Sequence, residues 1–241
     1  MLRSLFVTLA LALAFAAQAH ATECVPSLVA SPALAKVDAE TRLAFLERRL
    51  ERASHNAKIW TGTWAGVFSA LTIGGAVLIP LVEKGARVDY YFTAGKSLVG
   101  LASLGVVRLR AIGDARWLRS RSRTDACALV ADAERLLVRS AKSENEGRTL
   151  VFHVGNLALN MGSLLVLGLV FDRWDSAALQ GVGGSVIGEL MIATRPRTAE
   201  DALDAYRGAN LGAAAKRDPI PVAVYPLVLH QGGGLAVSGS F

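Results

Sequence analysis

Four apolar stretches, each about as long as the hydrocarbon core of a bilayer is thick, constrain this chain more than any other feature. They cover residues 61–82, 89–107, 150–171 and 176–194. An α-helix rises about 1.5 Å per residue, so each stretch forms a helix of roughly 30 Å. The connections within each pair, residues 83–88 and 172–175, leave room only for an antiparallel neighbour. The sequence therefore predicts two transmembrane helical hairpins.

The two predicted hairpins repeat one pattern, an Arg-x-Asp turn followed by a glycine-serine element. Arg87–Asp89 precedes Gly95–Gly100 in the first copy, and Arg173–Asp175 precedes Gly183–Gly188 in the second. We expect the aspartates to cap the helices that follow. Small residues let helices approach closely in lipid. The residues expected to pack in this way are Gly95, Ser97, Gly100, Gly184, Ser185 and Gly188.

The composition of the chain supports a membrane location and an exported precursor. Hydrophobic residues make up 52% of the sequence and charged residues 19%, which is too apolar for a typical soluble domain. Residues 1–21 are typical of a signal peptide, with Arg3, a short apolar core and an Ala19-His20-Ala21 cleavage site. Export to an oxidising compartment would permit a disulfide between Cys24 and Cys127, with two unrelated buried thiols as the alternative.

Polar helical segments and a β-hairpin complete the predicted fold. A heptad seam over residues 43–64 predicts a long helix that enters the membrane. The basic segment 108–149 is expected to contain a second amphipathic helix that starts near Thr124-Asp125. Aromatic side chains at Trp60, Trp64, Tyr90, Tyr91 and Trp174 suggest interface belts. The predicted fold class is an all-α membrane protein of four transmembrane helices in two repeated hairpins, with amphipathic extramembrane helices. The helical membrane domain covers 22–217, and a small C-terminal β-hairpin covers 218–241, with strands at 222–230 and 235–241.

Two features of the sequence bear on the orientation of the chain in the membrane, and they predict opposite orientations. Of the Lys and Arg residues outside the spans of the mature chain, 21 lie on the side of both termini, while Lys84, Arg87 and Arg173 lie in the hairpin turns. The positive-inside rule places the basic side in the cytoplasm, whereas a cleaved signal peptide places it outside. We follow the signal peptide and expect a bacterial cell-envelope membrane protein with its basic side in the periplasm. The alternative is an exported soluble or outer-membrane-associated helical protein.

Ionisable and amide side chains within the predicted spans are the candidate functional residues, because such groups are costly in lipid. Lys96 lies in the second span, Asn156 and Asn160 in the third, and Glu189 in the fourth. The asparagines share one helix face, which predicts interhelical hydrogen bonds, and His153 extends that face. Lys96 and Glu189 differ by roughly 9 Å in depth, so snorkelling or structural pairing is favoured over transport chemistry.

The sequence contains no pattern that identifies an enzyme, a metal site or a bound cofactor. Gly95-Lys96-Ser97 differs from a phosphate-binding loop, which needs a glycine where Tyr90 stands. His, Cys and carboxylate residues lack the spacing of metal ligands. The arginine-rich run 116–123 is interpreted as a solvated face or a contact for anionic lipid headgroups. We expect no nucleic-acid partner.

Three segments of the sequence resemble a known group of proteins: residues 172–176, residues 186–196 and the closing residues 232–241. They resemble an uncharacterised family of bacterial exported hydrophobic proteins. This resemblance implies no activity, cofactor or catalytic residue.

The sequence has many helix faces suited to packing, but it has no recognisable set of catalytic or metal-binding residues. This combination favours a structural role. We expect a scaffold or interaction subunit of a bacterial envelope membrane complex, whose partners are membrane lipid and other membrane subunits or further copies of the chain. The alternative is a small transporter or channel component, in which Lys96, Glu189, Asn156 and Asn160 line a polar path. An integral-membrane enzyme ranks third.

Overall fold

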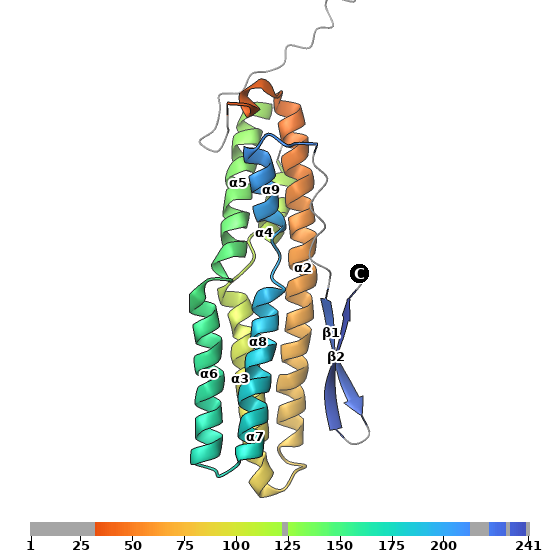
Figure 1. Cartoon of the computed structure of the whole chain (residues 1–241). Helices are drawn as coiled ribbons and strands as arrows, with labels where there is room; N and C mark the ends of the chain where they lie inside the picture. The colour runs from red at the N-terminus through yellow and green to blue at the C-terminus, as the bar shows by residue number, and fades with distance from the viewer. Residues whose placement is uncertain (1–31, 122–124, 213–221, 230–231, 240–241) are drawn as a thin grey trace, which may run out of the picture.

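One continuous helix passes through the whole length of the molecule and organises both of its parts (Figure 1). The computed structural model describes residues 32–121, 125–212, 222–229 and 232–239. Its helices are α2 Ala39–Leu78, α3 Arg87–Val106, α4 Ala111–Arg119, α5 Ala126–Glu146, α6 Leu150–Leu169, α7 Trp174–Ala178, α8 Gly184–Ala193 and α9 Thr198–Arg207. Shorter turns are η1 Leu34–Lys36, η2 Lys84–Ala86 and η3 Leu179–Gly183, the last of them a π-helix.

The upper part in Figure 1, which we call the head, consists of the first half of α2 together with α4, α5 and α9. Asp38 and Asp125 cap α2 and α5 by accepting hydrogen bonds from the backbone N–H groups of Thr41 and Ala128. The predicted seam is confirmed, because its members are all buried in one core: Leu43, Leu46, Leu50, Ala53, Ala57, Trp60 and Trp64. The head therefore has an ordinary hydrophobic core.

The lower part in Figure 1, which we call the apolar half, consists of the second half of α2 with α3, α6, α7 and α8. Large hydrophobic side chains are exposed on each of these helices, and the one on α7 is Trp174. Leu150 and Val151 are each 75% exposed, and Val106 is 84% exposed. A surface of this kind needs an apolar environment, and lipid provides one.

Among the described residues, three helical stretches are long and apolar enough to cross a membrane. They lie within Ala39–Leu78, Ala126–Leu169 and Trp174–Arg207, and their apolar lengths are the second half of α2, α6, and α7 to α8. The prediction of four transmembrane helices is therefore wrong. The difference is the predicted span 89–107, where α3 carries Asp89 and Lys96 and is correspondingly less apolar. The chain is a membrane-associated helical protein.

Two strands near the C-terminus are described by their backbone alone. β1 Val222–Leu229 pairs antiparallel with β2 Gly232–Gly239, with Val222 opposite Gly239. Residues 32–121 and 125–212, whose side chains the structure describes, contain no strand and form an all-helical body. The predicted fold class is corrected to this all-helical body with three apolar helices, and no argument below depends on the strands. The predicted signal peptide lies outside the described residues.

Candidate functional site

The four candidates that the sequence indicates, Lys96, Asn156, Asn160 and Glu189, meet in one hydrogen-bonded chain between helices of the apolar half. The Lys96 ammonium on α3 donates to Asn160 Oδ1 at 3.2 Å. Asn160 Nδ2 donates to Asn156 Oδ1 at 2.8 Å, and Asn156 Nδ2 donates to Glu189 Oε1 on α8 at 2.9 Å. His153 Nδ1 lies 2.6 Å from Glu189 Oε2 and extends the chain. We call these five residues the polar ladder.

Every amide in the polar ladder points the same way. Each asparagine accepts a hydrogen bond from the Lys96 side and donates one toward the Glu189 side. The two amide dipoles are thus aligned between a cation and an anion, an arrangement in which charge-assisted hydrogen bonds are strongest. Lys96 and Glu189 were expected to differ in depth, and two asparagines bridge the gap between them. The predicted interhelical bonding by Asn156 is confirmed.

The π-helix η3 provides the second acceptor for Lys96. Lys96 Nζ donates to the backbone oxygen of Gln180 at 2.6 Å. The same oxygen also accepts the backbone N–H of Gly184, so its two lone pairs serve one helical hydrogen bond and one bond from the ammonium group. The predicted fourth span is therefore an irregular helix, α7–η3–α8, and its irregular turn holds the ammonium group.

Glycines on α8 make room for the asparagine amides of the polar ladder. A Cβ atom on Gly184 would lie 2.0 Å from Asn160 Oδ1, and one on Gly188 would lie 2.0 Å from Asn156 Oδ1. Ser185, between them, accepts from Asn156 Nδ2 with its backbone oxygen. An i, i+4 glycine pair on α8 thus faces an i, i+4 asparagine pair on α6, and a side chain at either glycine would push the helices apart.

The first glycine-serine element packs differently from the second. A Cβ atom on Gly100 would lie 2.7 Å from the ring of Phe68, and Ser97 is buried. A Cβ atom on Gly95 would meet no neighbouring atom within 4 Å. The two copies of the sequence repeat therefore share small residues but have different contacts.

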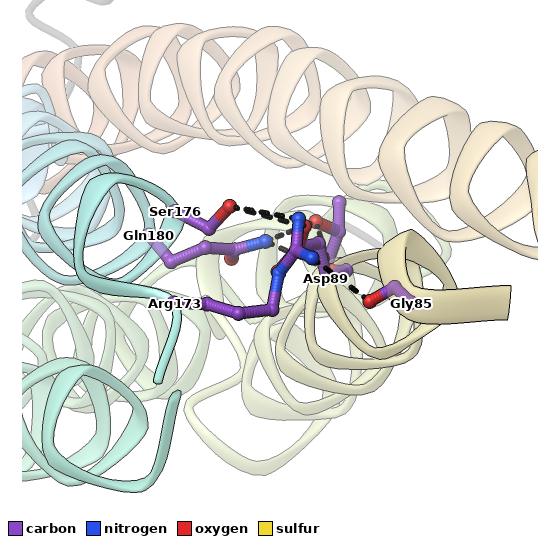
Figure 2. Close-up of polar contacts among 6 residues, drawn as sticks. Gly85, Asp89, Arg173, Ser176 and Gln180 are labelled. Atoms are coloured by element: carbon purple, nitrogen blue, oxygen red, sulfur yellow. Dashed lines mark hydrogen bonds and ion pairs between the residues drawn. The ribbon is translucent and has the colours of Figure 1, made fainter. Parts of the chain in front are cut away.

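A second polar cluster joins the two hairpin turns, and Figure 2 shows it. The Arg173 guanidinium binds both carboxylate oxygens of Asp89, with Nη2 to Oδ2 at 2.6 Å and Nε to Oδ1 at 3.1 Å. Its Nη1 donates to the backbone oxygen of Gly85 at 2.9 Å. Ser176 Oγ donates to Asp89 Oδ2 at 3.0 Å. We call this cluster the turn clamp.

The turn clamp corrects the prediction that each aspartate caps its own helix. Neither α3 nor α7 has a side-chain cap at its start, although Asp89 and Asp175 lie in their first turns. Arg173 of the second copy binds Asp89 of the first. Sequence reasoning also missed Gln180, whose amide donates to the backbone oxygen of Asp89 at 2.8 Å. Its own backbone oxygen binds Lys96, so it links the turn clamp to the polar ladder.

A buried arginine holds the junction between the head and the apolar half. Arg195 is 4% exposed, and its guanidinium donates to the backbone oxygens of Val107, Ser143 and Glu144. These carbonyls lie at or near the C-terminal ends of α3 and α5, where a cation is favoured. A Cβ atom on Gly147 would lie 2.3 Å from the Arg195 guanidinium carbon. The junction is thus packed around one cation.

The buried carboxyl group of Glu144 stabilises the start of α9 at the same junction. Glu144 Oε2 accepts from the N–H groups of Ala199 at 2.8 Å and Glu200 at 3.1 Å. Burial raises the pKa of Glu144 to about 8, although the two backbone donors oppose that shift. Arg148 forms an ion pair with Glu200 across the same link.

The aromatic belt predicted at this level is only partly correct. Trp60 and Trp64 are 7% and 3% exposed, so they belong to the core and do not face headgroups. Both indole N–H groups donate to Thr194 Oγ1, at 3.3 and 3.2 Å. Tyr91 and Trp174 are 59% and 50% exposed at the turn end.

A buried ion pair inside the head was not predicted from the sequence. Arg42 and Glu134 are each 1% exposed and lie 2.5 Å apart, and Tyr206 donates to the same glutamate oxygen at 2.5 Å. Burial raises the pKa of the Tyr206 phenol well above its usual range. Arg42 lies on the seam face of α2, and a charged residue on that apolar face was the one feature of the sequence that could have indicated the buried pair.

The remaining candidates concern cysteine and metal chemistry. Cys127 is disulfide-bonded, while Cys24 lies outside the described residues, so their pairing stays a prediction. Within the described ranges, no group of three His, Cys, Asp or Glu side chains is arranged to hold a metal ion.

Comparison with known proteins does not assign the chain to a family or a function. No protein-family model matches the chain, and no curated protein or solved structure matches it either.

Proposed function

We propose that this protein is a scaffold subunit of a bacterial envelope membrane complex, which holds a charged helical head at a fixed position on the membrane. The observation that carries the proposal is the unbroken course of α2. It has 40 residues, or about 60 Å, and it contributes to the cores of both the head and the apolar half. A helix shared in this way prevents the head from swivelling on a flexible tether.

The contacts at the junction support the same role. Asn56 Nδ2 on α2 donates to Thr198 Oγ1 on α9 at 2.9 Å, and Arg148 Nη1 donates to the backbone oxygen of Pro196 at 2.9 Å. Together with Arg195, these bonds join every chain crossing between the two parts. A rigid junction suits a protein that positions partners, because a fixed geometry lowers the entropy lost on assembly.

The disulfide at Cys127 supports a periplasmic head, since disulfides persist in oxidising compartments. This orientation agrees with the signal-peptide interpretation and opposes the positive-inside rule. A reporter enzyme fused after Phe241 that is active only in the cytoplasm would overturn it.

Purification in mild detergent tests the scaffold role directly. We expect the chain to elute as an assembly of defined stoichiometry with other membrane proteins or further copies of itself. As a matched perturbation, two glycines inserted after Lys58 should interrupt α2 at the junction and release those partners while both parts remain folded. A lone monomer before any insertion would contradict the proposal.

A second candidate is a component of a transporter or channel, and the polar ladder is the observation that favours it. Lys96 and Glu189 are opposite charges joined by amides across apolar helices. Groups of this kind in a membrane are usual on ion and solute pathways.

Two substitutions separate the candidates. In K96M and E189Q, lost solute flux with an unchanged assembly would favour transport. Unchanged flux with weakened helix packing would assign the polar ladder to structure alone. The E146Q variant, at an exposed glutamate of the head, is the control for a lost negative charge.

A further inference from the structure

The polypeptide crosses between the head and the apolar half four times, and each crossing carries basic side chains. Lys58 lies on α2, Arg108 and Arg110 lie between α3 and α4, and Arg197 lies between α8 and α9. The fourth crossing, between α5 and α6, carries Arg148.

Hydrogen bonds hold these crossings at one level along the molecule. The Arg110 N–H donates to Ser143 Oγ at 3.0 Å, which joins the α3–α4 link to α5. Arg195 Nη2 donates to the backbone oxygen of Val107 at 2.8 Å, which joins the α8–α9 link to α3. Trp60 bonds Thr194, so α2 lies at the same level. The basic residues therefore form a ring rather than a spiral.

Some basic side chains at this level serve the fold, and others face outward. Arg148 and Arg195 bond to groups of the protein, as described above. Lys58, Arg108, Arg110 and Arg197 are exposed. None of these four forms an ion pair with a described residue. Three of the nearby acids are occupied: Glu144 is buried, Glu200 binds Arg148, and Glu146 lies 3.8 Å from Lys142.

The exposed surface changes from charged to apolar within two residues at two crossings. Ile59, 49% exposed, follows Lys58, and Val106, 84% exposed, precedes Arg108 by two positions. At the α5–α6 crossing Leu150 is 75% exposed, whereas the Arg148 side chain is only 10% exposed and pairs with Glu200. This abrupt change is what the boundary between hydrocarbon and headgroups requires, and it puts the ring of positive charge at headgroup depth.

We propose that Lys58, Arg108, Arg110 and Arg197, which we call the basic collar, bind the phosphates of anionic membrane lipids. Guanidinium groups match phosphate oxygens bidentately, and ammonium groups bind them as point charges. The arginine run 116–123 was the site suggested by sequence, but Arg119 pairs with Glu51 in the head. This lipid-binding proposal depends on the membrane embedding of the apolar half, and it is independent of the scaffold role.

The test measures thermal unfolding in nanodiscs of phosphatidylcholine alone and of phosphatidylcholine with phosphatidylglycerol. Phosphatidylglycerol is expected to raise the Tm of the wild type at low salt, and high salt should reduce the rise. The K58Q/R108Q/R110Q/R197Q variant should lose most of the rise. A control with four charges removed higher in the head, K36Q/R48Q/R135Q/R207Q, should keep it.

Several results would overturn the collar. A rise in Tm that persists in the collar variant would show that these four residues do not bind the lipid. A rise that is lost equally in the control variant would show that only net charge matters. An equal rise on adding inorganic phosphate to phosphatidylcholine discs would mean that the lipid is not the ligand. A collar variant that unfolds earlier than the wild type in phosphatidylcholine alone would assign these side chains to the fold. A chain that does not enter nanodiscs would overturn the membrane embedding itself, whereas a monomer in detergent affects only the scaffold proposal.

Discussion

At the residue scale, the packing of the apolar half depends on two missing Cβ atoms. Gly184 and Gly188 let α8 approach the amides of Asn160 and Asn156 so closely that no other residue fits. Glycine normally weakens a helix by about 1 kcal/mol relative to alanine. At these positions the close contact and the interhelical hydrogen bonds offset that cost.

Replacing Gly188 by alanine is therefore expected to destabilise the protein. The new methyl group would meet Asn156 Oδ1 at 2.0 Å and disturb its bond to Glu189, at a cost of about 1–3 kcal/mol. Unfolding in detergent, followed by circular dichroism, measures the change. The control is G95A on α3, where a methyl group meets nothing within 4 Å and higher helix propensity should preserve or raise stability. Equal losses in the two variants would contradict the assignment.

The buried carboxyl of Glu144 predicts a pH dependence of stability. Its pKa is raised from 4.5 to about 8 in the folded state, so the folded protein holds a proton that the unfolded chain releases. This contribution to stability is complete below about pH 4.5 and is lost as the pH rises through 8. We expect Tm to fall between pH 5 and 9, and E144Q to remove most of the fall.

The neighbouring glutamate provides the matched control for this pH profile. Glu146 is exposed on the same helix, so E146Q should keep the wild-type fall in Tm. A profile of E144Q that parallels the wild type would assign the dependence to another group.

At the scale of elements, the turn clamp joins the α2–α3 turn to the α6–α7 turn. Its ion pair is partly buried, with Arg173 31% and Asp89 16% exposed. A double-mutant cycle with D89N and R173Q should give a coupling energy of about 1–2 kcal/mol. The pair Arg119–Glu51 is 56% and 64% exposed, and its cycle should give less than about 0.5 kcal/mol. Similar coupling in both cycles would mean that the clamp does not stabilise the turns.

The same scale separates what the sequence predicted from what it did not. Apolar runs and the heptad seam located the long helices, because periodicity is a local signal. The contact of Arg173 with Asp89 joins residues 84 positions apart and depends on how two turns meet. The sequence repeat favoured local caps instead. The bond between Lys96 and the Gln180 carbonyl was missed because it forms only when another helix lies beside the π-turn.

The candidate site was likewise predicted only in part from the sequence. Lys96, Asn156, Asn160 and Glu189 were identified because polar residues stand out in apolar runs. Their order in the polar ladder, and the role of Gly184 and Gly188 beneath them, depended on the register between α6 and α8. That register is a property of tertiary packing, which residue types alone do not determine.

At the scale of the whole molecule, the predicted disulfide would fasten the N-terminal segment to the head. Cys127 lies on α5 and is bonded, and Cys24 is the other cysteine of the sequence. Closing a loop of about 100 residues is expected to stabilise the head by roughly 2–5 kcal/mol. Maleimide should label neither cysteine before reduction and both after it. In C127S, Cys24 should become reactive without reduction, and an unreactive Cys24 would contradict the pairing.

The continuity of α2 also has a mechanical consequence. In the proposed embedding, one stiff rod of about 60 Å lies half in the bilayer and half outside it, so it behaves as a lever whose pivot is the headgroup layer. A bilayer that thins by a few ångströms makes long helices tilt. A tilt of about 10° would swing the far tip of the head sideways by roughly 5 Å. Membrane thickness is thereby converted into the position of a surface that lies well outside the membrane.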